Sequence, residues 1–142
     1  MVAPFKIAPY VLVAPLSWLL AGSAKFVINS LKHRRLAWRQ IGYGGLPSTH
    51  TAIVSASGWL VGMREGWNSP IFSVALTLTL IVVIDATSLR RHIGKQATAL
   101  NLLLESMPDA VRLRGRMGHR WIDILAGAAV GWLAAYFLSG TF

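Results

Sequence analysis

Long stretches without a charged side chain alternate with short polar segments along this sequence. Four stretches contain no Asp, Glu, Lys or Arg, and they run over residues 7–24, 40–63, 66–84 and 124–142. About 20 consecutive apolar residues are enough for a helix to cross the ~30 Å hydrocarbon layer of a membrane. The pattern therefore predicts four membrane-spanning helices, at approximately Ala8–Phe26, Thr49–Met63, Pro70–Ile84 and Ile124–Leu138.

Two of these spans leave an alternative open. The span at Thr49–Met63 has the weakest apolar signal, because glycine and polar residues fill the N-terminal part of its charge-free run. The first span, with Lys6 before it and Gly22-Ser23-Ala24 near its end, also resembles a secretory signal with a small-residue cleavage site. Its apolar run is long for a signal, so we favour a retained helix.

The longest segment outside the spans lies between the third and the fourth, at Arg90–Arg120. Its middle part, Ala97–Glu105, suits a short helix at the membrane interface or across the bundle, and Pro108 is expected to end it. No internal repeat or interdomain linker divides the sequence. We therefore expect a single all-α domain over residues 1–142, an integral membrane bundle of about four transmembrane helices with a short interfacial helix between the third and the fourth.

Composition agrees with this expectation. Hydrophobic residues make up 54% of the 142 residues, and there is no cysteine, which excludes disulfides, thiolate metal sites and cysteine nucleophiles. The net charge of +9 would suit nucleic acid, but no basic domain lies outside the membrane, so we expect no nucleic-acid partner.

The basic residues are concentrated in two connections. Twelve of the fourteen lie there, at Lys25, Lys32, Arg34, Arg35 and Arg39, and at Arg90, Arg91, Lys95, Arg112, Arg114, Arg116 and Arg120. In a four-span chain both connections lie on one side, which the positive-inside rule makes cytoplasmic, with both termini outside. That predicts a bacterial cell (inner) membrane protein with its basic side in the cytoplasm, unless the cations are phosphate ligands needed on the other side. The stretch Arg112–Arg116 could meet anionic headgroups of membrane lipids, although an ordinary positively charged loop is slightly favoured.

The first candidate for chemistry is Gly44-Gly45-Leu46-Pro47-Ser48-Thr49-His50. A glycine-rich turn that leads into a helix forms a backbone anion site, because the first N–H groups of a helix have no intrahelical partner. Pro47 suits the entry to a helix, and Ser48 or Thr49 can cap it. His50 could then serve a bound phosphate; the alternative is a capped helix start with a solvated histidine.

His119 and Asp123 form the second candidate. Their spacing of four residues places them on one face of a helix, where the carboxylate can orient the imidazole. Gly127 and Gly131 continue the stripe and would let another helix approach closely. Taken alone, the pair also fits a helix start at which Asp123 favours the positive end of the helix dipole.

The third candidate is the segment Asp85–Ala97. The planar guanidinium groups of Arg90 and Arg91 match phosphate oxygens two at a time. Asp85, at the end of an apolar run, is expected to hold one of these cations, although an arginine pair there is otherwise an ordinary positive-inside anchor. We expect His92 to be a bystander.

Together these segments resemble the type-2 phosphatidic acid phosphatase superfamily, which also contains the vanadium haloperoxidases, and more closely its small divergent bacterial and plastid branch. That branch reads Gly-Gly-Met-Pro-Ser-Ser-His, then Asp-Ala-x-x-x-Arg-Arg-x-x-Gly-x-Gln-Ala with Leu-Asn after it, then Gly-His-x-x-x-acid-x-x-x-Gly. The matching strings are Gly44–His50, Asp85–Ala97 with Leu100-Asn101, and Gly118–Gly127. The resemblance spans about residues 20–135, with three motifs in order.

The resemblance implies a mechanism. His119 would attack phosphorus and form a phosphohistidine, Asp123 would hold its imidazole, and His50 would protonate the leaving oxygen and then activate water. The implied phosphate-binding and supporting residues are Lys25, Arg90, Arg91, Ser48 and Thr49, and Asp85, Gly45 and Gly118. No metal or other cofactor is required. The implied substrate is a lipid phosphate such as phosphatidic acid, phosphatidylglycerophosphate or a polyprenyl phosphate.

Departures from the main branch of the superfamily bear on the cations. Its Lys-x6-Arg-Pro element corresponds to Lys25 followed by Lys32-His33, and Thr49 stands for the glycine of its Pro-Ser-Gly-His. Its arginine, six residues before the nucleophile, falls on Leu113, whereas Arg91 precedes His119 by 28 residues. Arg112, Arg114 and Arg116 are therefore alternative ligands. Four spans are also fewer than the six helices usual there, so a site shared across a homo-oligomer, or completed by the interfacial helix, is open.

Two other functions are compatible with the sequence. One is a non-catalytic membrane protein that binds anionic lipid headgroups or serves in an assembly. The other is a metal-dependent membrane hydrolase with His50, His119 and Asp123 as ligands, although no His-Glu-x-x-His motif supports it. We favour the phosphatase.

Overall fold

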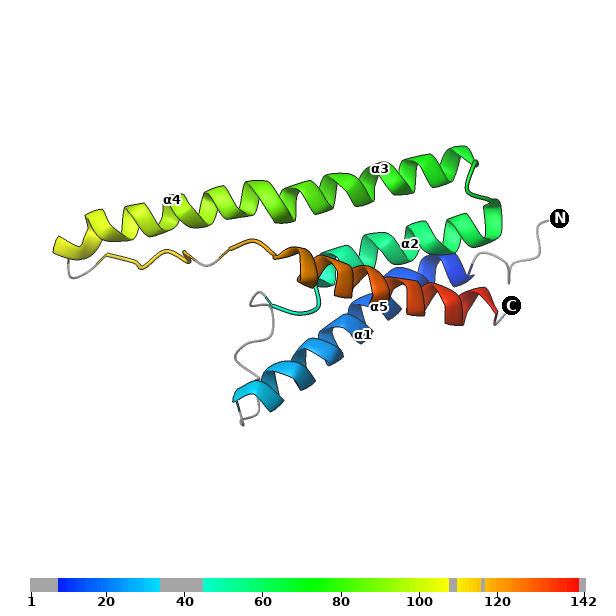
Figure 1. Ribbon diagram of the computed structural model, residues 1–142, viewed down its shortest axis with the longest axis horizontal. Helices are drawn as coiled ribbons and strands as arrows, with labels where there is room; N and C mark the ends of the chain where they lie inside the picture. Colours follow the sequence, from blue (N-terminus) through cyan, green and yellow to red (C-terminus); the bar gives the residue numbers. More distant parts are fainter. Residues whose placement is uncertain (1–7, 34–44, 108–109, 116, 141–142) are drawn as a thin grey trace.

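The computed structural model describes residues 8–33, 45–107, 110–115 and 117–140. Its helices are α1 (Ala8–His33), α2 (Thr49–Glu65), α3 (Pro70–Ile84), α4 (Arg90–Leu103) and α5 (Trp121–Ser139). A π-helical turn at Asp85–Leu89 joins α3 to α4, and a 3-10 turn at Leu104–Ser106 ends α4. Regular structure in the described ranges is helical throughout (Figure 1), which confirms the all-α prediction.

α3 and α4 form one continuous helix of 37 residues, from Pro70 to Ser106 (Figure 1). At 1.5 Å per residue this helix is about 55 Å long. The prediction of a separate interfacial helix at Ala97–Glu105 was therefore wrong: those residues are helical, but they extend the third span. The physical reason is that no proline interrupts the chain between Pro70 and Ser106. Pro108, which was expected to end the helix, lies outside the described residues.

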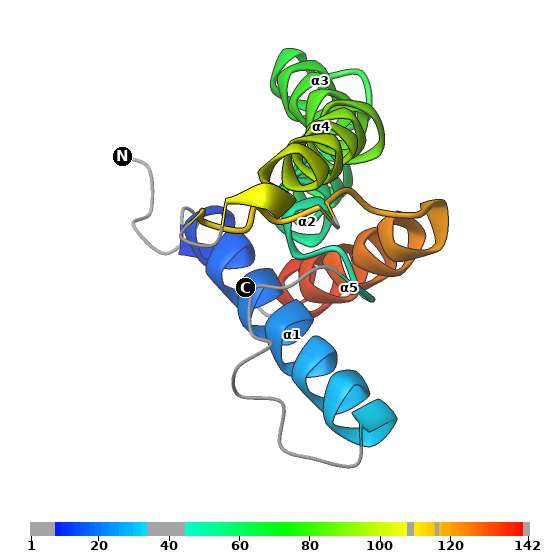
Figure 2. The same cartoon turned by 90° about the vertical axis from the view of Figure 1, so that its left-hand side faces the viewer.

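Three helices in the described part of the chain are long and apolar enough to cross a membrane: Pro9–Lys32, Pro70–Ser106 and Trp121–Ser139. The predicted span Thr49–Met63 forms α2 but is not one of them, since α2 has only 17 residues and includes many small or polar ones. α2 lies in the middle of the bundle, between α3 on one side and α1 and α5 on the other (Figure 2). Its surface is therefore covered largely by other helices instead of lipid.

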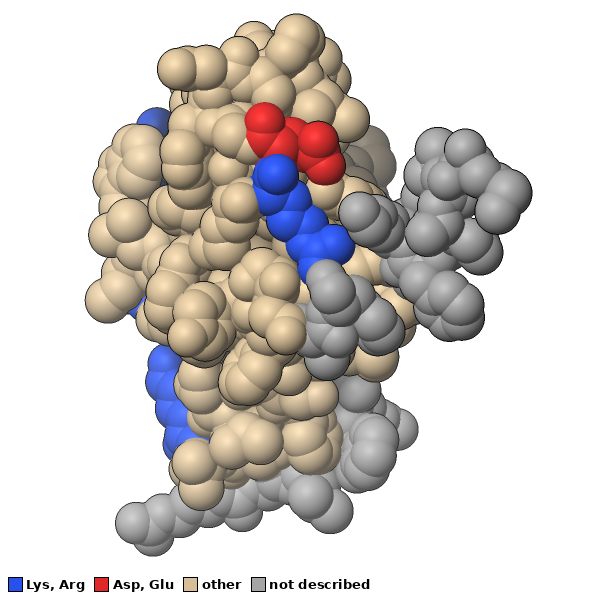
Figure 3. All heavy atoms as spheres, turned by 90° about the vertical axis from the view of Figure 1, so that its right-hand side faces the viewer, with Lys and Arg blue, Asp and Glu red and all other residues tan. Residues whose placement is uncertain are grey.

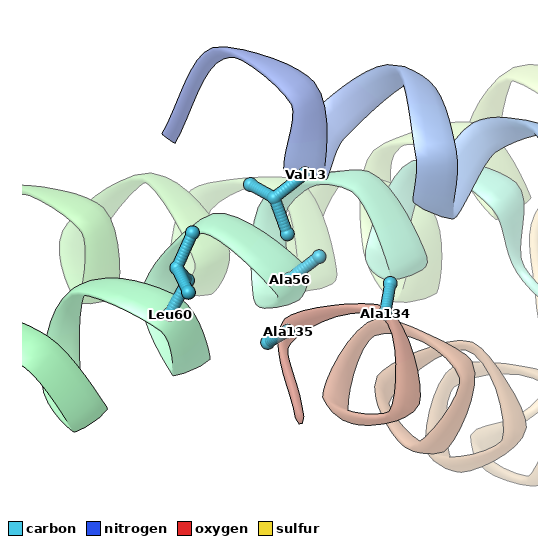
Figure 4. Close-up of a cluster of buried hydrophobic side chains, with 5 residues drawn as sticks. All are labelled: Val13, Ala56, Leu60, Ala134 and Ala135. Atoms are coloured by element: carbon cyan, nitrogen blue, oxygen red, sulfur yellow. The ribbon is translucent and has the colours of Figure 1, made fainter. Parts of the chain in front are cut away.

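The buried core joins α2 to α1 and α5. It consists of Val13 from α1, Ala56 and Leu60 from α2, and Ala134 and Ala135 from α5 (Figure 4). Most of these side chains are small, so the helix backbones approach closely, as is usual where helices associate in membranes.

The glycine stripe of α5 packs directly on α2. A Cβ atom on Gly131 would lie 2.6 Å from the Ala52 carbonyl oxygen, and one on Gly127 would lie 3.1 Å from Thr51 Cβ. Both distances are shorter than ordinary contacts, so glycine is needed at each position. The prediction that these glycines permit close helix packing is confirmed.

The two ends of the bundle differ in chemistry. At one end, Tyr10 of α1 donates a hydrogen bond to Glu65, and Arg64 of α2 donates to the carbonyl oxygens of Leu138 and Ser139. Figure 3 shows that most of the described surface on this end is uncharged. At the opposite end, α2 and α5 begin and α3 passes into α4 (Figure 1). Lys25 of the first basic connection and Arg114 of the second lie close enough there to interact electrostatically; the cytoplasmic location of this end stays a prediction.

Candidate functional site

The turn before α2 is tied to the start of α5. Gly45 has a φ of 126°, the Leu46–Pro47 peptide is cis, and Ser48 caps α2 by accepting a hydrogen bond from the Thr51 N–H at 3.4 Å. The Ser48 backbone N–H donates to the Asp123 carbonyl oxygen at 2.8 Å. Ser48, which was predicted to bind phosphate, has a fully buried side chain that lies 2.9 Å from the Thr51 hydroxyl. Its backbone N–H joins the two helix starts.

His119 and Asp123 form a buried pair. His119 Nδ1 lies 3.8 Å from Asp123 Oδ2, and that oxygen accepts a 2.9 Å hydrogen bond from the Arg120 N–H. Among the described residues, His119 Nδ1 and Asp123 Oδ1 have no hydrogen-bond partner although both are buried. Such groups are rare and call for an explanation. A small side-chain movement would close the gap to a hydrogen bond, as catalytic pairs often do when substrate binds.

The backbone of His119 is held from both sides by the junction of α3 and α4. Its N–H donates to the Ala86 carbonyl oxygen at 3.0 Å, and its carbonyl oxygen accepts from Arg91 Nη2 at 3.1 Å. Gly118 has a φ of 92°, and a Cβ there would lie 2.6 Å from Arg91 Cγ. His119 therefore lies just before α5, not within it as the helical stripe implied. The N-cap residue Arg120 connects it to α5.

Arg90 and Arg91 point to different partners. Arg90 Nε lies 2.6 Å from Asp85 Oδ2, so the predicted pairing of Asp85 with one arginine is confirmed. These residues are five apart, which the wide π-helical turn between them places on the same side of the helix. Arg91, by contrast, donates to the His119 backbone.

The remaining charged groups converge on the same point from α1 and α2. Lys25, in the middle of α1, is only 8% exposed and is attracted by Asp123. His50, in the first turn of α2, is exposed and lies within electrostatic range of Lys25, Asp85 and Arg90. The predicted residues brought together in this way are Lys25, His50, Asp85, Arg90, His119 and Asp123.

The electrostatic environment favours the neutral form of His119. Burial lowers its pKa below the ordinary value for histidine, and the positive charge of Lys25 lowers it further, against an opposing effect of Asp123. A neutral imidazole keeps one nitrogen with a free lone pair, which is the form that can act as a nucleophile or base.

Residues 8–134 match the divergent PAP2 family. The chain belongs to this family. A relative in Bacillus subtilis (strain 168), described as "Uncharacterized membrane protein YuiD", is 30% identical over 138 residues, which cover 85% of this chain and 87% of the relative. No solved structure matches the chain. The resemblance carried by the three motifs is thus confirmed, and the chain is a membrane protein of the divergent PAP2 family.

In this divergent PAP2 protein, a further part of the second motif, Asp85–Asn101, holds the segment that leads to His119. Asn101 donates to the Leu113 carbonyl oxygen at 2.7 Å and accepts from the Leu113 N–H at 2.8 Å. A Cβ on Gly94 would lie 2.6 Å from the Gly115 carbonyl oxygen. The sequence signal was present, since Gly94 and Asn101 belong to the matched strings, but no role was assigned to them. They clamp the returning segment along α4.

The three arginines considered as alternative phosphate ligands, Arg112, Arg114 and Arg116, differ in their surroundings. Arg114 lies close enough to Lys25 to repel it electrostatically, and so belongs to the surroundings of the site. Arg112 is exposed, and Arg116 is outside the described residues.

The three candidate metal ligands are not arranged as a ligand cluster. Within the described ranges, no group of three or more His, Cys, Asp or Glu side chains converges closely enough to hold a metal ion. The alternative hydrolase based on His50, His119 and Asp123 as ligands therefore has no geometric support here.

Proposed function

We propose that this protein is a membrane-embedded lipid phosphate phosphatase that acts through a phosphohistidine. The observation that carries the proposal is the buried His119–Asp123 pair, in which His119 Nδ1 and Asp123 Oδ1 have no hydrogen-bond partner among the described residues, beside Lys25, Arg90 and His50. A nucleophile, an orienting carboxylate, a second histidine and two cations are the groups that phosphoryl transfer through histidine requires.

The first step transfers the phosphoryl group to His119. Because Nδ1 faces Asp123, Nε2 is the nitrogen left to attack phosphorus. The new P–N bond forms as the P–O bond to the lipid breaks, and His50 gives its proton to the departing oxygen. Asp123 holds the Nδ1–H and stabilises the positive charge that develops on the ring.

The second step returns the enzyme to its starting state. His50, now neutral, takes a proton from water while the water oxygen attacks phosphorus, and the P–N bond breaks to release inorganic phosphate. In both steps Lys25 and Arg90 stabilise the negative charge on the phosphoryl oxygens. Fixed charges of this kind usually supply the largest part of the rate enhancement.

The position of the site suits a lipid headgroup. It lies where α2 and α5 begin, at one end of a bundle with three apolar membrane-length helices. A substrate can bind its phosphate there while its tails stay in the bilayer. Phosphatidic acid, phosphatidylglycerophosphate and polyprenyl phosphates or pyrophosphates all fit this description.

The test is phosphate release by the detergent-purified protein from a panel of these lipids. His119→Ala should lose release entirely, whereas His92→Ala should keep it, because His92 is exposed and its Nδ1 pairs with the carbonyl oxygen of Ser88 in its own helix. Release should also survive a metal chelator. If the wild type and His119→Ala are equally inactive while both bind anionic lipid, the non-catalytic lipid-binding function is favoured instead.

A further inference from the structure

The π-helical turn at Asp85–Leu89 interrupts the long α3–α4 helix next to the candidate site. Such turns are rare and occur mostly as single turns inside α-helices, frequently at functional sites. Ala86, within the turn, bonds to the His119 backbone, and Arg90, directly after it, acts electrostatically on His119. The turn therefore contacts the candidate site through two of its residues.

The turn joins Asp85 to Arg90 twice. The Arg90 backbone N–H donates to the Asp85 carbonyl oxygen, and Arg90 Nε lies 2.6 Å from Asp85 Oδ2. In an α-helix, residues five apart are separated by about 1.4 turns and lie on nearly opposite sides. The extra residue of the π-helical turn brings the two side chains to the same side, so the ion pair depends on the turn.

The same turn also provides the acceptor for the His119 backbone. In an α-helix the Arg90 N–H would donate to Ala86, four residues before it. Here that N–H donates to Asp85, and the Ala86 carbonyl oxygen accepts the His119 N–H at 3.0 Å. One local change of hydrogen bonding thus places both the cation and the backbone of the proposed nucleophile.

The ion pair with Asp85 leaves most of the Arg90 guanidinium for an anion. Asp85 is contacted by Nε, and the other four N–H groups are on the two Nη atoms. The planar group matches two oxygens of one phosphoryl group. Because Asp85 fixes the plane of the guanidinium beforehand, less side-chain freedom is lost when the anion binds. The Arg90 side chain is 35% exposed, which leaves it open to a substrate.

We propose that Asp85 is a positioning residue of this site, which holds Arg90 by Nε so that both Nη groups face the phosphoryl oxygens of the substrate. This role rests on the proposed function, since it takes the phosphoryl group as the anion that Arg90 binds. Arg90 touches the substrate and Asp85 acts through it. Asp85 should therefore matter only as long as Arg90 is present.

A double-mutant cycle on phosphate release tests this dependence. Arg90→Met should lower kcat/KM per folded molecule about 10²- to 10³-fold, as loss of a charge-stabilising donor does, and Asp85→Ala about ten- to a hundredfold, through misplacement of Arg90. In the Arg90→Met background, Asp85→Ala should change kcat/KM by less than about twofold. Asp85→Asn keeps an acceptor for the Nε–H and should lie between the wild type and Asp85→Ala.

The cycle also separates this role from two others. Asp85 acts electrostatically on His50, and an effect through His50 would persist in the Arg90→Met background. A purely structural effect would persist there as well. Losses that simply add would therefore overturn the proposal. Glu105→Ala, which removes an exposed carboxylate at the end of the same helix, is the matched control and should leave kcat/KM unchanged.

Two further readouts do not depend on phosphatase activity. With isotope-labelled arginine, the Arg90 Nε–H resonance should be shifted downfield by the carboxylate and lose this shift in Asp85→Ala but not in Glu105→Ala. An unchanged resonance overturns the proposal. In titrations with inorganic phosphate, Asp85→Ala should raise the Kd about tenfold in the wild-type background and not in Arg90→Met.

The two proposals can fail separately. If no lipid phosphate is hydrolysed while phosphate binding follows the cycle, the phosphatase is wrong and the role of Asp85 stands. If release is lost in His119→Ala but the effects of Asp85→Ala and Arg90→Met add, the phosphatase stands and the role of Asp85 is wrong. A wild type that neither hydrolyses lipid phosphates nor binds phosphate overturns both.

Discussion

Arg90 and Arg91 are adjacent in the sequence and chemically identical, yet they contact different groups. Arg90 is held by Asp85 and acts electrostatically on both His50 and His119. Arg91 instead donates to the His119 carbonyl oxygen. Under the proposed function a phosphate would thus meet Arg90 directly, while Arg91 holds the backbone of His119. The sequence could not distinguish the two, because an Arg-Arg pair carries no information about which way each side chain turns.

The lowered pKa of His119 makes a prediction about pH dependence. The imidazole must be neutral to attack phosphorus, so kcat/KM should fall on the acid side with a midpoint below ~6.5, the ordinary histidine value. Lys25→Met removes the positive charge with the largest effect on this group, so the pKa of His119 rises and the acid midpoint moves to higher pH. Lys32→Met, at an exposed position of α1, is the matched control. The pH profile of phosphate release measures both.

The lowered pKa of His119 can be checked independently through the pH dependence of folding stability. A histidine whose pKa is lower in the folded state binds its proton more readily when unfolded, so folding stability is lost as pH falls below ~6.5. His119→Ala should weaken this loss. An acid midpoint that Lys25→Met leaves unchanged would contradict the electrostatic account of His119.

At the scale of elements, the returning segment and α4 together hold His119 in place. Asn101→Ala removes both hydrogen bonds to Leu113 and should lower the free energy of unfolding by about 1–2 kcal/mol. Since His119 is then less firmly placed, kcat should fall about ten- to a hundredfold with little change in KM. Asn68→Ala, in the exposed turn before α3, is the control.

The value of kcat per folded molecule distinguishes poorer positioning of His119 from a simple loss of folded protein. Asn101→Asp keeps an acceptor for the Leu113 N–H and should lie between the wild type and Asn101→Ala in kcat. A change in active fraction alone, with kcat per folded molecule unchanged, would contradict a role in positioning His119.

Some elements of the fold and of the candidate site could be predicted from the sequence and others could not, for physical reasons. Charge-free runs give helices, because only a helix or closed barrel satisfies every backbone group in lipid. The pairing of His119 with Asp123 followed from their spacing, although His119 lies before α5 and the N-cap residue Arg120 connects it to the helix. The continuity of α3 with α4 was missed because the charge-free run ends at Ile84, although no proline interrupts the chain there. The Asn101 clamp could not be predicted, because its partner is a backbone segment with no pattern of its own.

At the scale of the whole molecule, the site depends on how closely α2 and α5 cross. The same α5 backbone carries Asp123, next to the site, and Gly131, two turns further on, which meets Ala52 and Ser55 of α2. The Ser48 N–H bond to Asp123 then fixes the two helix starts relative to each other. Core packing and site geometry are thus two parts of one interface. A substitution that disturbs the packing of α2 on α5 should therefore also change the geometry of the site.

Gly131→Ala tests this coupling. Its Cβ would lie 2.6 Å from the Ala52 carbonyl oxygen and 2.9 Å from the Ala56 nitrogen, backbone atoms that cannot move without shifting α2. We expect a net loss of about 1–2 kcal/mol in the free energy of unfolding, because overpacking outweighs the better helix propensity of alanine. Gly22→Ala, where nothing lies within 4 Å, should instead be neutral or stabilising. Denaturant titration in one detergent compares them, and Gly131→Ala should also lose phosphate release per folded molecule, since the two helix starts separate. Equal stability of the two variants would mean that the α2–α5 contact is looser than its geometry implies.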